Sequence, residues 1–125
     1  MSFSRRGVLT AAMALGPLCA LPGLAKAQGS GTPIRILVGF PAGGGTDAIA
    51  RLLAEKLKDE LGSPVVVENR GGAGGQIAAQ ALKAATPDGH TLFLSHDHSI
   101  SILPQVVKNP GFNPASDFVP VAGFA

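Results

Sequence analysis

Two glycine-rich clusters are the part of this sequence best suited to chemistry. The first, Gly43–Gly45, leads into Thr46 and Asp47, and the second spans Gly71–Gly75. Each follows an apolar run and precedes a helical pattern, and the free N–H groups at a helix N-terminus attract carboxylates or phosphates. A single glycine cluster would be explained by a tight turn that requires positive φ. In the first cluster we expect this positive φ at Gly44 or Gly45. Two clusters after successive strands predict a rim that binds anions.

An alternative interpretation of the first cluster is a dinucleotide site. Residues 43–48 (GGGTDA) match G-x-G-x-x-A, and Glu68 follows about 20 residues later, where a ribose-binding acid belongs. Against this, Pro41 and Ala42 separate the apolar run from the first glycine, and the second cluster is outside the fingerprint. An exported dinucleotide-binding, Rossmann-like oxidoreductase fragment is therefore the second hypothesis. A Walker A loop is excluded because no Lys-Ser or Lys-Thr pair follows either cluster.

Residues 95–99 (SHDHS) form a third polar cluster. His96, Asp97 and His98 are of ligand types that bind metals, but the sequence offers no third partner on the same face. We therefore expect a polar loop without metal or cofactor. Ser95 lacks a nucleophile-elbow context, and the only cysteine, Cys19, lies in the N-terminal apolar segment. These features favour a binding protein over an enzyme.

Alternating strand and helix patterns surround the clusters. Short β-branched runs predict strands, and apolar residues at helical spacing predict helices. The expected strands are Ile34–Phe40, Pro64–Glu68, Thr91–Ser95 and the start of a fourth at Phe118–Phe124; the expected helices are Asp47–Leu61 and Gln76–Ala85, and Asn109–Pro114 is expected to be a loop. This order predicts an α/β fold with a parallel sheet and right-handed crossovers.

The first predicted helix is amphipathic. Its apolar stripe contains Ile49, Leu52, Leu53, Leu57 and Leu61, which we expect to face the sheet. Thr46 or Asp47 is expected to cap its start, and Gly62 to end it.

The N-terminus has the plan of a secretory signal peptide. Arg5 and Arg6 precede an apolar stretch from Val8 to Leu24, which ends in the small-x-small pattern 25–27 (AKA). We expect cleavage after Ala27 and export to the periplasm. The arginine pair fits both a twin-arginine and an ordinary Sec signal.

The composition of the chain excludes some classes of protein and of binding partner. The chain has 125 residues, of which 46% are hydrophobic and 14% charged, and this excludes a disordered charged tail. The excess of basic over acidic residues lies in the predicted signal peptide, because residues 28–125 contain seven Lys or Arg and eight Asp or Glu. With no Trp and no Tyr to stack on bases, we expect no nucleic-acid partner.

Five segments together resemble the Bug-type solute receptors of tripartite tricarboxylate transporters. They are 33–36 (PIRI), 40–47 (FPAGGGTD), 65–75 (VVVENRGGAGG), 87–92 (PDGHTL) and 112–121 (FNPASDFVPV). They occur in the family's order and cover nearly all of residues 33–125. Two positions depart from the family pattern: His90 replaces a tyrosine, and the third-strand loop of the family usually lacks His-Asp-His.

The resemblance implies a lobe of a two-lobed, Venus-flytrap periplasmic-binding-protein fold, of type II-like form, with residues 28–125 forming the N-terminal part of the first lobe. It also implies a periplasmic receptor that captures a small carboxylated solute (a di- or tricarboxylate, an amino acid or an aromatic acid) and delivers it to membrane subunits. The residues that the resemblance places around the ligand are Phe40, Pro41, Gly43, Gly44, Gly45, Thr46, Asp47, Ala73, Gly74, Gly75, Ser95 and His96.

Overall fold

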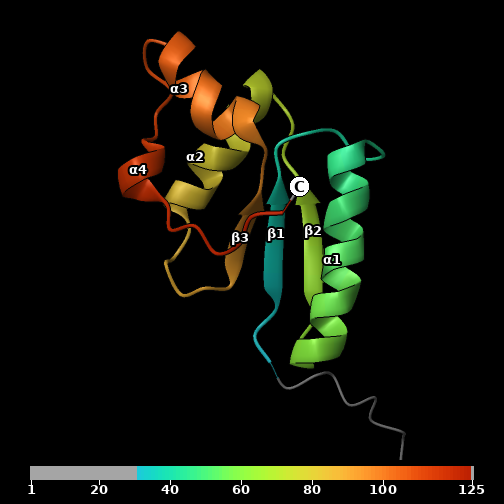
Figure 1. Ribbon diagram of the computed structural model, residues 1–125. Coiled ribbons are helices and arrows are strands. Elements are labelled where there is room, and N and C mark those ends of the chain that lie inside the picture. Colours follow the sequence, from blue (N-terminus) through green and yellow to red (C-terminus); the bar gives the residue numbers. More distant parts are fainter. Residues whose placement is uncertain (1–30, 125) are drawn as a thin grey trace, which may run out of the picture.

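The computed structural model describes residues 31–124, drawn in colour in Figure 1. The predicted signal peptide therefore lies outside the described residues. The elements are β1 (Ile34–Val38), α1 (Gly45–Leu61), β2 (Val65–Asn69), the 3-10 turn η1 (Ala73–Gly75), α2 (Gln76–Ala84), β3 (Thr91–Leu94), the π-helical turn η2 (His98–Ile102), α3 (Leu103–Val106) and α4 (Pro114–Asp117).

The three strands form one parallel sheet in the order β2-β1-β3. In the register, Arg35 of β1 lies opposite Val66 of β2 and Thr91 of β3. All three strands therefore end at the same edge of the sheet, and the loops that follow them start there. The predicted α/β class and parallel sheet are confirmed.

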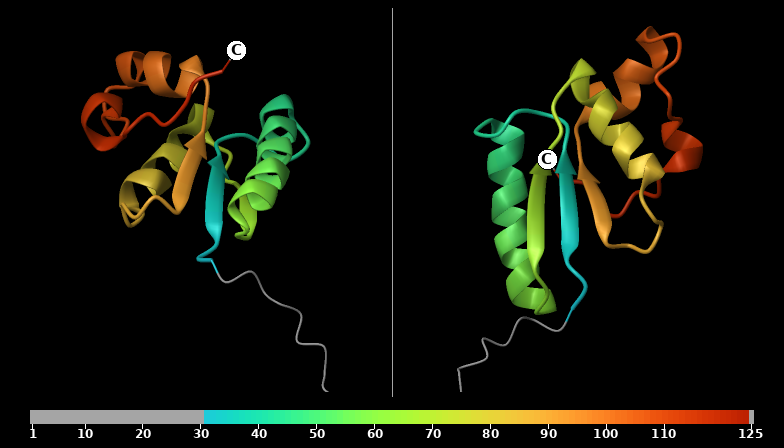
Figure 2. Two further views of the ribbon diagram at one scale, coloured as in Figure 1. Left: turned by 60° about the horizontal axis from the view of Figure 1, so that its bottom comes forward. Right: turned by 180° about the vertical axis from the view of Figure 1, so that it is seen from behind.

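The central strand β1 is buried on both faces. Ile36 and Val38 pack with Ala50 and Ala54 of α1, whereas Leu37, also buried, points to the other side because side chains alternate along a strand. A second core cluster, made of Ala79, Leu103 and Phe112, lies on that other side. Figure 2 shows the sheet between α1 and α2, so each helix covers one face.

The predicted apolar stripe of α1 is partly wrong. Ile49, Leu52 and Leu61 are 47%, 60% and 55% exposed, whereas Ala50 and Ala54 are buried. The two alanines let the helix approach the sheet closely, and this turns the helix so that part of its leucine stripe faces outward. Leu53 and Leu57 do pack against the core, as predicted.

At the ends of α1, the expected N-terminal cap is wrong and the expected C-terminal glycine is confirmed. The N-cap is Gly44, with no side-chain cap hydrogen bond, so neither Thr46 nor Asp47 occupies the cap position. Gly62 ends the helix in the left-handed conformation, with φ 62°, and its N–H bonds the carbonyl of Lys58, as its type predicted.

The predicted fourth strand is wrong within the described residues. Phe118–Phe124 has no strand assignment, and Val119 and Val121 are more than 80% exposed. Pro120 in this segment has no N–H to donate to a strand ladder.

The predicted loop Asn109–Pro114 is also corrected, because Pro114 is the first residue of α4. Asn113 caps this turn: its side chain accepts a bond from the Ala115 N–H, and its own N–H bonds Asp117 Oδ2 at 2.7 Å. None of the helices described between residues 31 and 124 is long and apolar enough to span a membrane.

Candidate functional site

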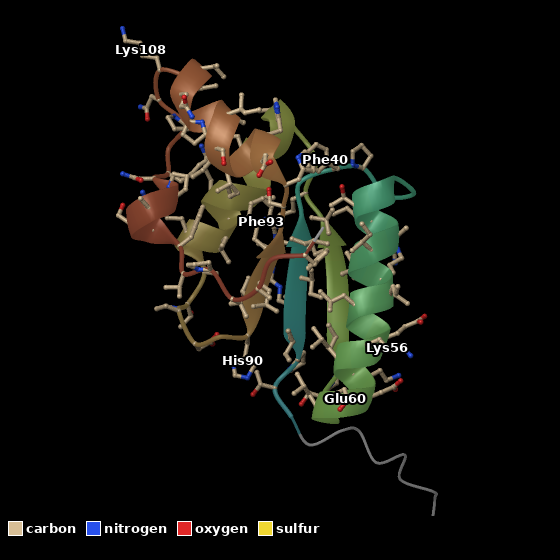
Figure 3. The ribbon with its side chains drawn as sticks, in the orientation of Figure 1. Phe40, Lys56, Glu60, His90, Phe93 and Lys108 are labelled. Carbon is tan, nitrogen blue, oxygen red and sulfur yellow. The ribbon has the colours of Figure 1, made fainter. Side chains whose placement is uncertain are left out.

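Three loops at the carboxyl ends of the strands pack against one another. We call this surface the rim and define it as residues 39–47, 70–76 and 95–99. The N–H of Arg70 bonds the carbonyl of Val38 at 2.8 Å, which joins the second loop to the end of β1. Phe40 and His90 lie at opposite ends of the sheet in Figure 3, so His90, one of the two departures from the family pattern, lies away from the rim.

The first loop offers a row of backbone donors. The helical ladder of α1 begins with the bond from the Ala48 N–H to the Gly44 carbonyl. The N–H groups of Gly45, Thr46 and Asp47 precede it, and no hydrogen bond from them is found within residues 31–124. A Cβ placed on Gly45 would meet no atom within 4 Å.

The expectation of positive φ at Gly44 or Gly45 is wrong. Gly44 has φ −81°, and Gly45 is absent from the positive-φ residues of the described chain. The turn is made instead at Gly43, with φ 87°. The backbone conformation at positions 44 and 45 therefore does not require glycine.

Asp47 supports the first loop from beneath. It is only 3% exposed. Its Oδ2 accepts bonds from the Gly43 N–H at 2.8 Å and from Arg51 Nε at 2.9 Å. Its Oδ1 accepts a bond from Asn69 Nδ2 at 3.0 Å, and the same amide group donates to the Phe40 carbonyl at 3.2 Å. One carboxylate thus ties the Gly43 turn to α1 and to the end of β2.

These contacts explain the charge state of Asp47. The hydrogen bond from Arg51, with further bonds from the Gly43 N–H and Asn69, lowers the pKa of Asp47 from 3.8 to about 2. Asp47 is therefore an anion near neutral pH. Its negative charge is compensated from below the loop, which leaves the amides on the rim available to another anion.

The second loop has an unusual backbone conformation. Ala73, Gly74 and Gly75 have φ of 47°, 65° and 95°, and Ala73 is the only non-glycine with positive φ in the described part of the chain. Such backbone persists when its surroundings hold it in place. Here it brings the N-terminus of α2 onto the rim.

Ser99 is the side chain that holds this loop, and sequence reasoning missed it. It is completely buried, and its Oγ donates to the Gly74 carbonyl at 2.6 Å. Gly75 fits between Ser99 and β1: an added Cβ would lie 2.3 Å from Ser99 Oγ, and one on Gly39 would lie 2.7 Å from Gly75 Cα. The only signal in the sequence was one small residue in each of the three loops, Gly39, Gly75 and Ser99, which permits a close approach of the loops.

Aromatic and imidazole rings line the third loop. The Phe40 and His96 rings stack with centroids 4.5 Å apart and 24° between their planes. The His98 ring lies 6.4 Å from that of His96, tilted by 51°. His96 and His98 are exposed, whereas Phe40 is half-buried. Ser95 Oγ donates to the backbone carbonyl of His96 at 3.3 Å. A carbonyl is not a general base, so this contact does not activate the Ser95 hydroxyl as a nucleophile.

Two alternative interpretations find no support here. No cluster of three or more His, Cys, Asp or Glu that could hold a metal occurs within the described range. Glu68, the residue expected to bind a ribose, is held instead by Arg35 Nε at 3.1 Å and Arg70 Nε at 2.7 Å.

Known proteins resemble this chain in sequence and in fold. Residues 49–125 match the tripartite tricarboxylate transporter family receptor. Protein BugT of Bordetella pertussis is 43% identical over 95 residues, which are 72% of this chain and 28% of that protein. The periplasmic binding protein BugD has a TM-score of 0.62 and 48% identity, covering 66% of this chain and 27% of BugD. R. palustris Rpa4515, solved with adipate, has a TM-score of 0.69 and 35% identity, covering 72% and 30%.

The chain thus spans less than a third of the length of these relatives. Its family match nevertheless covers more than half of the chain, from within α1 onward. The resemblance that the five segments gave is confirmed. This chain belongs to the family of tripartite tricarboxylate transporter receptors.

Proposed function

We propose that the complete protein is a periplasmic receptor that binds a small carboxylated solute and presents it to the membrane subunits of a tripartite transporter. Family membership supports the transport role, and the description of BugD as a periplasmic binding protein supports the location. The adipate in Rpa4515 supports a carboxylate as the ligand. The receptor binds and releases its solute and catalyses no reaction.

The observation that carries the proposal is the row of three amides at the start of α1. The N–H groups of Gly45, Thr46 and Asp47 lie at the positive end of a 17-residue helix, and a carboxylate oxygen is the acceptor such groups prefer. Thr46 is half-buried and adds a hydroxyl donor beside them. Asp47 contributes through its backbone, because its carboxylate is turned into the protein.

The remaining site residues complete the same surface. We assign the second loop a supporting role, since it sets the N-terminus of α2 beside the first loop. The proposed ligand-binding surface consists of Phe40, Pro41, Gly43, Gly44, Gly45, Thr46, Asp47, Ala73, Gly74, Gly75, Ser95 and His96.

A proline at position 45 tests the amide row without disturbing the helix. Proline removes a single N–H and is well tolerated at the first helical position. Gly44, which would precede it, already has the extended conformation that proline requires, with φ −81° and ψ 172°. The matched control is Gly45→Ala, which adds a Cβ in open space but keeps the N–H.

The assay is titration calorimetry of the full-length mature receptor with adipate. Loss of a hydrogen bond to a charged group, about 1.5–3 kcal/mol, should raise the Kd of Gly45→Pro at least tenfold over wild type. Gly45→Ala should remain within about threefold, because it retains every donor. Equal affinity of the proline and alanine variants would overturn the amide mechanism, and no binding of any small carboxylate by wild type would overturn the receptor function.

A further inference from the structure

We propose that this receptor binds a proton together with its carboxylated solute, and that the imidazoles of His96 and His98 are the site of that proton. This inference rests on the proposed function, because the carboxylate of the solute is the charge that attracts the proton. Histidine suits such a site, since its charge ordinarily changes between about pH 5 and pH 8. The rim therefore holds the solute more tightly in mildly acidic than in mildly alkaline solution.

Two charged side chains of the rim are compensated by partners and do not titrate near neutral pH. Asp47 accepts a bond from Arg51 Nε at 2.9 Å, and this bond contributes most to lowering the pKa of Asp47 to about 2. Arg70 donates to Glu68 at 2.7 Å, and the hydrogen bonds from Arg35 and Arg70 lower the pKa of Glu68. Both pairs therefore keep their charges through the range in which histidine titrates.

The third loop carries the other charged and titratable groups of the rim. Asp97 lies between His96 and His98 in the sequence, and all three residues are exposed. None of the ion pairs found within residues 31–124 includes Asp97. With both imidazoles neutral, the loop has one net negative charge, which repels a carboxylate, and one proton cancels that charge. A second proton is less favourable, because the two imidazole centroids are 6.4 Å apart and like charges repel at that distance.

Each imidazole contacts a different glycine-rich loop. The His96 ring stacks on Phe40 of the first loop, with centroids 4.5 Å apart. His98 lies against the second loop, since a Cβ built on Gly74 would be 2.7 Å from His98 Nε2. A proton on this histidine pair therefore adds its positive charge next to both loops.

Phe40 connects the histidine pair with the amides at the start of α1. Figure 3 shows Phe40 where β1 ends, beside the first turn of α1. Asn69 Nδ2 donates both to the Phe40 carbonyl at 3.2 Å and to Asp47 Oδ1 at 3.0 Å, so Phe40 and this first turn share one partner. A carboxylate held by the amides and the imidazole of His96 are thus both neighbours of Phe40. Charges attract one another within a screening length of about 10 Å at 0.1 M salt.

The direction of the pH effect follows from linkage. A bound anion favours the charged form of a nearby imidazole, so the complex binds more protons than the free receptor. The affinity for the solute must then rise as the pH falls through the range in which histidine titrates. Each tenfold increase in proton affinity on solute binding raises the solute affinity by up to tenfold, since the coupling is reciprocal.

The test measures the Kd of adipate and of malate by calorimetry at pH 6 and pH 8, with the full-length mature receptor. The double variant His96→Gln/His98→Gln keeps polar side chains but cannot take up the proton. Both single variants are measured as well, so that the comparison does not depend on the folding of the double variant. The matched control is His90→Gln, because His90 lies at the opposite end of the sheet (Figure 3). Titration of the solute itself affects every protein equally, and thermal unfolding at both pH values checks the fold.

The measured quantity is the Kd at pH 8 divided by the Kd at pH 6. We expect this ratio to be at least about threefold larger for wild type and His90→Gln than for the double variant, which corresponds to half a pKa unit of coupling. Each single variant should have a smaller ratio than wild type. A purely structural role of the histidines would weaken binding equally at both pH values and leave the ratio unchanged.

Two results would contradict the inference in different ways. If a carboxylate binds and the histidine variants keep the wild-type ratio, or His90→Gln loses it as well, the inference is wrong while the receptor function stands. If wild type binds neither adipate, malate nor any other small carboxylate at either pH, the proposed function fails and the inference fails with it.

Discussion

Replacing Ser99 by alanine should weaken the receptor at the point where the second and third loops join. The serine is fully buried and donates at 2.6 Å to the Gly74 carbonyl, in a loop whose backbone has positive φ at four successive residues, 72–75. Alanine removes the donor and leaves that carbonyl without its partner. An unsatisfied buried group destabilises a protein by about 1–3 kcal/mol, so we expect the free energy of unfolding to fall by that amount.

The assay is urea unfolding of the receptor followed by circular dichroism, with Ser101→Ala as the matched control. Ser101 lies two residues away on the same turn but is exposed, and such surface changes stay within about 0.5 kcal/mol. If Ser99→Ala is as stable as Ser101→Ala, the hydrogen bond to Gly74 does not hold the second loop and our description of the rim is wrong.

Three further changes test other contacts. Because the pKa of Asp47 is lowered to about 2, Asp47→Asn should destabilise the protein at pH 7, and its difference from wild type should shrink as pH falls from about 4 through 2; a constant difference in acid titrations would contradict this. Gly39→Ala places a Cβ 2.7 Å from the Gly75 backbone and should lower the unfolding free energy by about 1–3 kcal/mol, whereas Gly123→Ala, with nothing within 4 Å, should not. Asn113→Ala removes the cap of α4 and should cost about 1 kcal/mol in denaturant unfolding, with Asn113→Asp neutral; equal losses would exclude capping.

The elements of the fold were predictable because their signals are local. Apolar runs bounded by proline and glycine located all three strands to within about two residues, the usual uncertainty of such boundaries. Gly62 marked the end of α1 for a steric reason that depends on that residue alone. The orientation of α1 was not predictable in this way, because the close approach of Ala50 and Ala54 to the sheet depends on the partner surface.

In the candidate site too, features with a local signal were predictable, whereas contacts between distant residues were not. The two glycine clusters and the histidine loop indicated where the rim lies, since strand ends of a parallel sheet must share one edge. The sequence could not show that Asp47 turns inward to Arg51 and Asn69, because these partners lie on another turn and another strand. It suggested instead that Thr46 or Asp47 was a simple helix cap. Ser99 was missed for the same reason, since its acceptor is 25 residues away.

A crystal structure of the full-length mature receptor with a bound carboxylate such as adipate would test the proposed amide site most directly. We predict that one carboxylate group lies at the N-terminus of α1, with its oxygens 2.7–3.2 Å from the backbone nitrogens of Gly45 and Thr46, a normal hydrogen-bond length. In that complex Asp47 should keep its bonds to Arg51 and Asn69. A carboxylate bound by arginine side chains, with the α1 amides facing only water, would contradict the proposed binding by the amides of Gly45 and Thr46.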